Sequence, residues 1–249
     1  MIVNKDLTKD YFNQIAKEYS VNNHKGNLDK SQVFLKEFLP VADAPSLLEC
    51  GGGGGFYTQL FLKLGYNVDV VDISEEALLI NKNNAEKKGF ANNLNTYAGN
   101  FNEIVLQLNK QYNQVVFIKV LHHFDSITEI KQAVEIGYNS LKNNGRLIIF
   151  EPNGRNPFWE MFLKRKYDKV ANKTKWDIEK NLKYTTVSNL TSFFNENKIS
   201  YNVKYKYVIP AFLMQKQGFI TNILKIINNI LEKIFLKYWA FNVLIIVNK

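Results

Sequence analysis

Five consecutive glycines at residues 51–55 separate a short apolar run that ends at Glu49 and Cys50 from an amphipathic stretch at 56–64. The apolar run predicts a strand, and the stretch after the glycines predicts a helix closed by Gly65. A glycine turn lets the backbone approach a ligand because no Cβ atoms intervene, and a helix start directs N–H groups at negative charge. The sequence therefore predicts a strand, turn and helix that bind a charged, nucleotide-like cofactor at residues 49–56.

Two common glycine motifs do not fit this turn. A dinucleotide fingerprint needs a third glycine five positions after the first, where this chain has Phe56, Tyr57 or Thr58, depending on the register. A phosphate-binding P-loop needs Lys followed by Ser or Thr after the glycines, and Phe56 and Tyr57 stand there instead. What remains is an acid followed by alternate glycines, at Glu49, Gly51, Gly53 and Gly55.

A second apolar run, residues 66–74, also ends in an acid, Asp72. A carboxylate at the end of a strand can accept hydrogen bonds from both hydroxyls of a ribose, whereas it would repel a phosphorylated ribose. Ile73 would then lie against the base, and Ser74 is expected to cap the next helix. This run therefore predicts the nucleoside half of the cofactor site.

These two segments resemble the first and second motifs of the class I S-adenosylmethionine-dependent methyltransferases. Residues 97–101, 114–124 and 141–153 are similar to the later motifs of that family, in family order. One departure is Asn100, which stands where the family usually has an acid; its amide oxygen can accept the same hydrogen bond from the adenine amino group without the charge. The resemblance covers about residues 47–153 and implies S-adenosyl-L-methionine as cofactor and S-adenosyl-L-homocysteine as product.

The resemblance also implies roles for single residues. The carboxylate of the cofactor would face N–H groups near residues 53–56, and its ammonium would be drawn toward Glu49, directly or through water. An aromatic residue at the position of Tyr19 often contacts the cofactor in this family. The cofactor-binding residues predicted in this way are Tyr19, Glu49, Gly51, Gly53, Gly55, Asp72, Ile73, Asn100, Phe101 and Val120.

Strands and helices alternate through residues 47–151, which predicts a parallel sheet with helices on both faces. The expected fold is α/β: a doubly wound, Rossmann-like sheet of seven strands, mostly parallel, with the last strand antiparallel as the resemblance implies. At 249 residues, we expect a single methyltransferase domain. Its predicted parts are an N-terminal helical flap at 1–46 and a cofactor-binding core at 47–153. Two helical insertions, at 154–185 and 211–238, are predicted to form a substrate lid.

A methyl acceptor with a hydroxyl or phenol group needs a base to remove its proton, and the candidates are His122, His123 and Glu151. A Leu-His-His turn is also frequent in the family across many substrates, which favours a structural or cofactor-side role instead. The single cysteine, Cys50, reads as a small core residue rather than a nucleophile. No His, Cys or Asp cluster has metal-ligand spacing, so no metal is predicted.

The acceptor is expected to be a small molecule, either a metabolite or a lipid-like compound, methylated on oxygen, nitrogen or carbon. The residues after the predicted fourth strand, 119–123, lack the Pro-Pro-Tyr type of motif used for amino groups of DNA or glutamine, and they lack the Cys of RNA 5-methylcytosine enzymes. DNA is therefore not expected as a partner. An RNA-modifying methyltransferase, which the net charge of +9 would suit, and a non-catalytic cofactor-binding module remain alternatives.

The insertion at 211–238 carries a broad apolar stripe at helical spacing, with lysines among the apolar residues. It is expected to be a lid over the site, a dimer helix or a helix that touches a membrane surface, and the chain is expected to be a monomer or a homodimer. No stretch is long and apolar enough for a transmembrane helix, and the first residues have no signal-like apolar core. A cytoplasmic enzyme is therefore expected.

Overall fold

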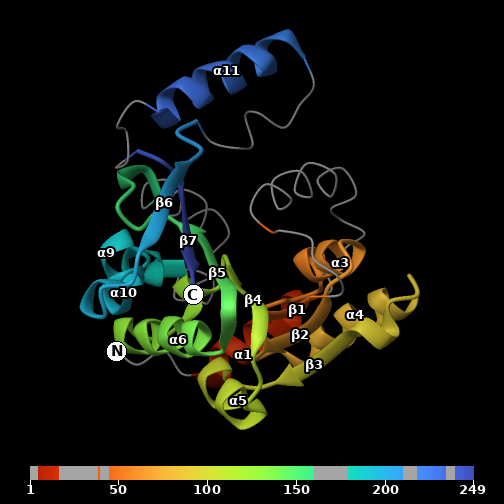
Figure 1. Cartoon of the computed structure of the whole chain (residues 1–249). Coiled ribbons are helices and arrows are strands. Elements are labelled where there is room, and N and C mark those ends of the chain that lie inside the picture. The colour runs from red at the N-terminus through yellow and green to blue at the C-terminus, as the bar shows by residue number, and fades with distance from the viewer. Residues whose placement is uncertain (1–4, 17–38, 40–44, 160–178, 210–217, 234–238) are drawn as a thin grey trace. The chain divides into compact units, whose positions relative to one another are not determined.

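Residues 5–16, 39, 45–159, 179–209, 218–233 and 239–249 are described by a computed structural model of the chain (Figure 1). Tyr19, predicted to contact the cofactor, lies outside these residues, as do most of the predicted flap and parts of both predicted insertions. Among the helices that are described, none has both the length and the hydropathy needed to cross a bilayer.

Seven strands form one sheet in the order β3-β2-β1-β4-β5-β7-β6. β1 pairs in parallel with β2 and with β4, β2 pairs in parallel with β3, and β6 and β7 are antiparallel. The strands are β1 Ser46–Cys50, β2 Asn67–Asp72, β3 Leu94–Ala98, β4 Tyr112–Ile118, β5 Leu141–Pro152, β6 Tyr201–Lys206 and β7 Asn242–Asn248. This order confirms the predicted Rossmann-like fold and places its topological switch point between β1 and β4, where such folds bind their ligands.

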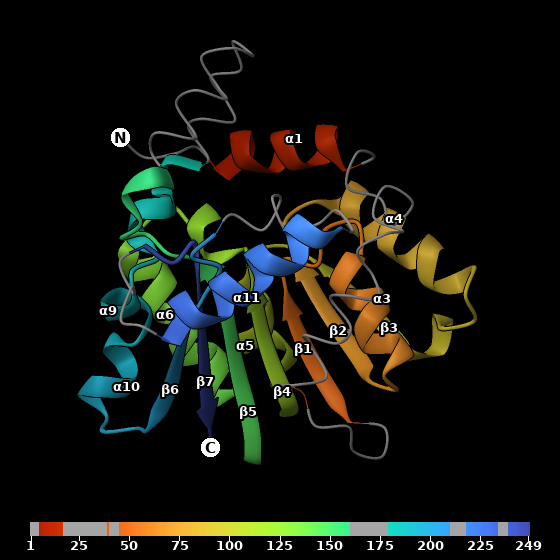
Figure 2. The same cartoon turned by 90° about the horizontal axis from the view of Figure 1, so that it is seen from above.

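Helices connect the parallel strands and cover both faces of the sheet: in Figure 2, α3 lies in front of β1–β3 and α5 lies behind the strands. They are α3 Phe56–Lys63, α4 Glu75–Glu86, α5 Phe101–Leu108 and α6 Ile127–Asn139. The Ser74 hydroxyl accepts a hydrogen bond from the backbone N–H of Ala77, so it caps α4 as predicted. The Asn100 side chain caps α5 by accepting from the N–H of Asn102 at 2.9 Å.

The remaining elements are short or peripheral. They are α1 Lys5–Ile15, α9 Val187–Leu190, α10 Ser192–Glu196, α11 Phe219–Lys233 and the 3-10 turns η2 Ala91–Asn93, η3 Leu121–His123 and η4 Lys180–Tyr184. The chain divides into two compact units: residues 1–118, 132–148 and 248–249 form unit 1, and residues 119–131 and 149–247 form unit 2. Unit 1 is built on β1–β4, with fully buried Leu47, Leu48 and Phe117, and unit 2 buries Phe194 and Ile245.

The sequence patterns at 127–142 and 187–197 each predict one helix, and the structure differs from both predictions. The helix predicted over 127–142 ends at Asn139, because Ser140 accepts a hydrogen bond from the N–H of Tyr112 and the chain then continues as β5. The helix predicted over 187–197 is expected to be capped at Thr185 or Thr186; the structure has the cap at Thr186 and breaks the helix into α9 and α10. At the break, the Thr191 hydroxyl donates to the carbonyl of Val187 at 2.8 Å and so competes with the regular helix bonds.

Candidate functional site

The glycine turn follows β1 in unit 1 and has the backbone that alternate glycines allow. Gly51, Gly53 and Gly55 have φ angles of 70°, 50° and 90°, in the left-handed region that L side chains rarely adopt. A Cβ added at Gly55 would collide with the side chain of Asn81, whereas a Cβ added at Gly53 would meet nothing within 4 Å. The turn is therefore closed behind Gly55 and open beside Gly53, as a backbone cradle for a ligand requires.

Glu49 belongs to β1, two residues before the first glycine of this turn, and is 2% exposed. Its Oε2 accepts a hydrogen bond of 2.6 Å from the Thr58 hydroxyl on α3, which in turn accepts one of 2.8 Å from the Asn81 amide on α4. Burial raises the pKa of Glu49 to about 8, against the lowering effect of the Thr58 hydrogen bond and with a further rise from the charge of Asp72. Pairing with a cation would stabilise the charged form of this buried carboxyl, because the ion pair would offset the solvation that the carboxylate lost on burial.

Asp72, at the end of β2, joins the glycine turn to the next helix. Its Oδ2 accepts from the N–H of Gly53 and its Oδ1 accepts from the N–H of Ser74, both at 2.8 Å. Burial raises the pKa of Asp72, although these backbone hydrogen bonds oppose the rise. The backbone N–H of Ile73 also favours the charged carboxylate, and since a carboxylate offers about four acceptor sites, it can still accept from a ligand hydroxyl.

Two contacts that the sequence did not indicate hold helix α1 against the start of α4. The Ser74 hydroxyl donates to Asn13 Oδ1 at 2.6 Å, and Lys9 Nζ lies 2.7 Å from Glu75 Oε1. Helix α1 therefore contacts Ser74, which follows Asp72 by two positions in the sequence.

The predicted base-binding residues follow β2 and β3. Asn100 uses its side-chain oxygen as the cap of α5. The Phe101 side chain is buried and packs edge-on against Phe117 of β4, with ring centroids 5.0 Å apart. Phe101 could therefore meet a ligand only through its backbone, whereas Ile73 is half-buried.

A nucleoside that carries an amino acid fits these groups. Glu49 is a buried acceptor for an ammonium group, Asp72 is an acceptor for ribose hydroxyls, and the open cradle at Gly53 admits an extended chain. Within the described residues, no group of three or more His, Cys, Asp or Glu side chains could hold a metal ion.

Glu151, at the end of β5 in unit 2, is fully buried and accepts three hydrogen bonds. Its Oε1 accepts from the N–H groups of Val120 and Leu121 at 2.7 and 2.8 Å, and its Oε2 lies 2.8 Å from His122 Nδ1. Lys119, just before this turn, has a φ of 53°, which is uncommon for a residue other than glycine and typical of functional loops. The geometry makes Glu151 an anchor of the η3 turn, because both of its oxygens are engaged.

His122 also faces a second acid, Glu179, which the sequence reasoning missed. Its Nε2 lies 3.7 Å from Glu179 Oε2, and the Glu179 side chain is 21% exposed. Two hydrogen bonds hold the segment after Glu179 in place: Asn181 Nδ2 donates to the carbonyl of Phe124, and the Thr185 hydroxyl donates to the carbonyl of Pro152. The imidazole is thus placed between one buried and one accessible carboxylate.

The pKa values of the adjacent residues His122 and His123 are shifted in opposite directions. Burial alone would lower the pKa of His122, but the hydrogen bond and charge of Glu151, together with the charge of Glu179, outweigh it and raise this pKa above its ordinary value. The pKa of His123 is held well below its ordinary value by burial and by the charge of His122. Pairs of groups whose environments push their pKa values apart are typical of acid–base sites.

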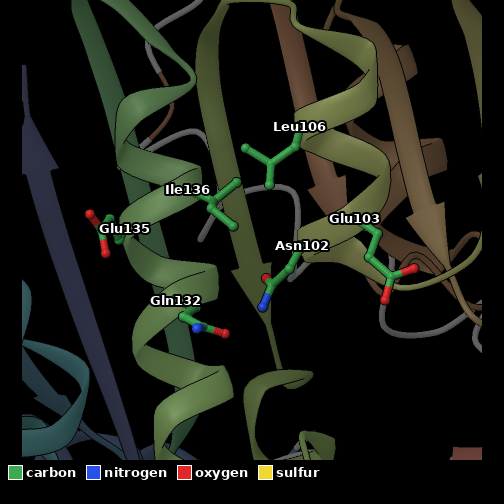
Figure 3. Close-up of a pocket in the computed structure, with 6 residues that line it drawn as sticks. All are labelled: Asn102, Glu103, Leu106, Gln132, Glu135 and Ile136. Atoms are coloured by element: carbon green, nitrogen blue, oxygen red, sulfur yellow. The ribbon is translucent and has the colours of Figure 1, made fainter.

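A surface pocket in unit 1 lies elsewhere, between α5 and α6. Figure 3 shows Leu106 and Ile136 turned into the space between the two helices, with Asn102 and Gln132 farther along it. Glu103 and Glu135 complete its lining, so none of the predicted site residues belongs to this pocket.

Comparisons with known proteins agree with this geometry. Residues 48–147 match the family model of a methyltransferase domain. The ribosomal protein L11 methyltransferase of Prochlorococcus marinus is 31% identical over 106 residues, which are 41% of this chain and 32% of that protein. The chain therefore spans about a third of the length of the curated relatives it matches.

Solved structures share the fold. A SAM-dependent methyltransferase from Archaeoglobus fulgidus has a TM-score of 0.61 at 16% identity, over 89% of this chain and 94% of that one. A geranyl diphosphate C-methyltransferase from Streptomyces coelicolor has a TM-score of 0.58 at 14% identity, over 88% of this chain and 77% of that one. At these identities the likeness establishes a shared architecture.

The sheet order and the glycine cradle define a Rossmann-like nucleoside-binding protein. Residues 48–147, which hold this cradle, match the family model of a methyltransferase domain, and the solved structures that share the fold include SAM-dependent methyltransferases.

Proposed function

We propose that this chain transfers a methyl group from S-adenosyl-L-methionine to a small-molecule acceptor. The observation that carries the proposal is the cradle itself: a buried Glu49 behind an open glycine turn and an Asp72 fixed by two backbone N–H groups. In this proposal Glu49 holds the ammonium group and Asp72 holds the ribose hydroxyls. The bound cofactor supplies an activated methyl group, so the protein's task is to align the acceptor and exclude water.

For an acceptor with an acidic O–H or N–H group, we assign the base to His122. Glu151 accepts from Nδ1–H of its imidazole, which leaves the lone pair of Nε2 to take a proton from the acceptor. The imidazolium that forms is stabilised by the carboxylates of Glu151 and Glu179. Glu151 acts as a positioning residue in this assignment.

The curated relative does not decide the acceptor. Its name refers to a ribosomal protein, but the match includes only 41% of this chain and 32% of the relative. In proteins of this fold, the cofactor-binding core serves many acceptors, so identity over part of the chain carries little information about the acceptor.

The test is to incubate the purified protein with cell extract and cofactor bearing a deuterated methyl group, and to search by mass spectrometry for compounds that gain one CD3 group. We expect labelled small molecules, and no label with the Asp72→Ala variant. Label confined to RNA or to protein would replace the proposed acceptor class. Tight cofactor binding in calorimetry without label in any fraction would indicate a binding module instead.

A further inference from the structure

Helix α11 of unit 2 has its polar side inward and its apolar side outward. Thr221 and Asn228 are buried, with exposures of 7% and 4%. The large apolar side chains that are exposed on this helix are Phe219, Ile220, Ile223, Ile226, Ile227 and Ile230. Phe219, Ile220 and Ile226 are 81%, 73% and 61% exposed, which is the opposite of a helix that packs its apolar stripe on a core.

Hydrogen bonds fix this orientation. Asn228 Oδ1 accepts from the N–H of Ile209 at 3.0 Å, and Glu232 Oε1 accepts from the N–H of Tyr207 at 2.7 Å. Asn228 Nδ2 donates to the same Glu232 oxygen, and Lys206 Nζ lies 3.4 Å from the other. The end of β6 and the residues after it thus bind the polar side of α11. Figure 1 shows α11 beyond the end of β6. Turning the apolar side inward would break the three contacts with Lys206, Tyr207 and Ile209.

The charges around the helix favour one occupant for the apolar face. The only acid in α11 is Glu232, which is engaged with Lys206, whereas Lys225 and Lys233 belong to the helix and Lys216 and Lys237 flank it in the sequence. The whole chain carries a net charge of +9. Two copies of a chain with this net charge repel each other, while an anionic lipid surface attracts it.

We propose that α11 lays its exposed apolar face into the surface of an anionic lipid bilayer. At 15 residues the helix is about 22 Å long, which is too short to span the hydrocarbon core but sufficient to lie in the interface. The exposed isoleucines and Phe219 enter the boundary between headgroups and acyl chains. This contact is independent of methyl transfer, so it is tested without turnover.

The experiment is flotation of the full chain with vesicles of equal parts phosphatidylcholine and phosphatidylglycerol. The double variant Ile226→Gln/Ile230→Gln removes two exposed apolar side chains without touching the polar contacts of Asn228 and Glu232. The matched control is Leu79→Gln/Leu106→Gln, which removes two apolar side chains of similar exposure from α4 and α5.

We expect the parent protein and the control to float with these vesicles, and the α11 variant to bind about tenfold more weakly or worse. Binding should also weaken with pure phosphatidylcholine vesicles and with added salt. The proposal is overturned if the parent protein does not bind the mixed vesicles, or if the α11 and control variants bind equally. It is also overturned if the parent is a dimer in ultracentrifugation that the α11 variant dissociates while vesicle binding stays unchanged.

Discussion

Glu49 shows how one buried residue can report cofactor binding. Its pKa is raised from 4.5 to about 8, chiefly by burial, so the free protein holds this proton at about pH 7. An ammonium group placed beside the carboxyl would favour the charged form and release the proton. We therefore expect nearly one proton released per cofactor at about pH 7, and much less at about pH 9, where Glu49 is already ionised. Calorimetry in buffers of different ionisation enthalpy measures this number.

The Glu49→Gln variant is the control for proton release. It keeps an oxygen for the Thr58 hydroxyl but has no proton to lose, so release at about pH 7 should disappear. Because the folded-state pKa is raised, Glu49 also contributes stability that is fully present below 4.5 and is lost as pH rises through about 8. The variant should flatten that slope in chemical denaturation curves. Unchanged proton release in the variant would move the assignment to another group, such as Asp72.

His122 gives a second prediction at the scale of single residues. If Nε2 is the base, kcat/KM for an acceptor with an ionisable proton rises with pH through the raised pKa of His122. Glu179→Gln removes one of the charges that raise this pKa, so the rise should shift to lower pH. The exposed Glu196→Gln substitution on α10 is the control, and its pH profile should match the parent. A Glu179→Gln profile that loses height without shifting would contradict the assignment.

At the scale of elements, the turn between β1 and α3 separates backbone strain from collision. An alanine at Gly53 meets an unfavourable φ of 50° but open space, whereas an alanine at Gly55 meets both a φ of 90° and the side chain of Asn81. Gly53→Ala should cost about 1 kcal/mol of folding free energy. Gly55→Ala should cost about 1–3 kcal/mol more, because packing against Asn81 must shift. Urea unfolding of the two variants measures the difference, and equal losses would contradict this geometry.

The sequence was informative where function depends on neighbours along the chain. The acid and alternate glycines of β1 and its turn, the acid that ends β2, and the cap at Ser74 are local patterns, so the strand, turn and helix units and the match to a methyltransferase domain could be predicted from them. Asn13 and Glu179 were missed because tertiary packing, rather than spacing, brings them to Ser74 and His122. Periodicity likewise revealed the apolar stripe of α11 but could not tell which side faces outward, since Asn228 and Glu232 decide that through contacts with β6 and the residues after it.

At the scale of the whole molecule, the predicted roles fall into different compact units. The cradle of Glu49, the glycines and Asp72 belongs to unit 1, whereas His122, Glu151, Glu179 and α11 belong to unit 2. Ligand binding stabilises the state that binds it, and the local effect is greatest where hydrogen bonds must open for amide exchange.

Amide hydrogen exchange of the full chain should therefore distinguish binding of the cofactor product from binding of the acceptor. S-adenosyl-L-homocysteine alone should slow exchange about tenfold or more at residues 51–58 and 72–77, because the amides of Gly53, Ser74 and Ala77 bond to groups of the proposed site or its caps. Exchange at 120–123 should slow further only when an acceptor is also present, since those amides are held by Glu151 in unit 2. Asp72→Ala should abolish the first effect by weakening cofactor binding. Protection by the product at 120–123 without any at 51–58 would place the cofactor away from the glycine turn and refute the assignment of the cradle.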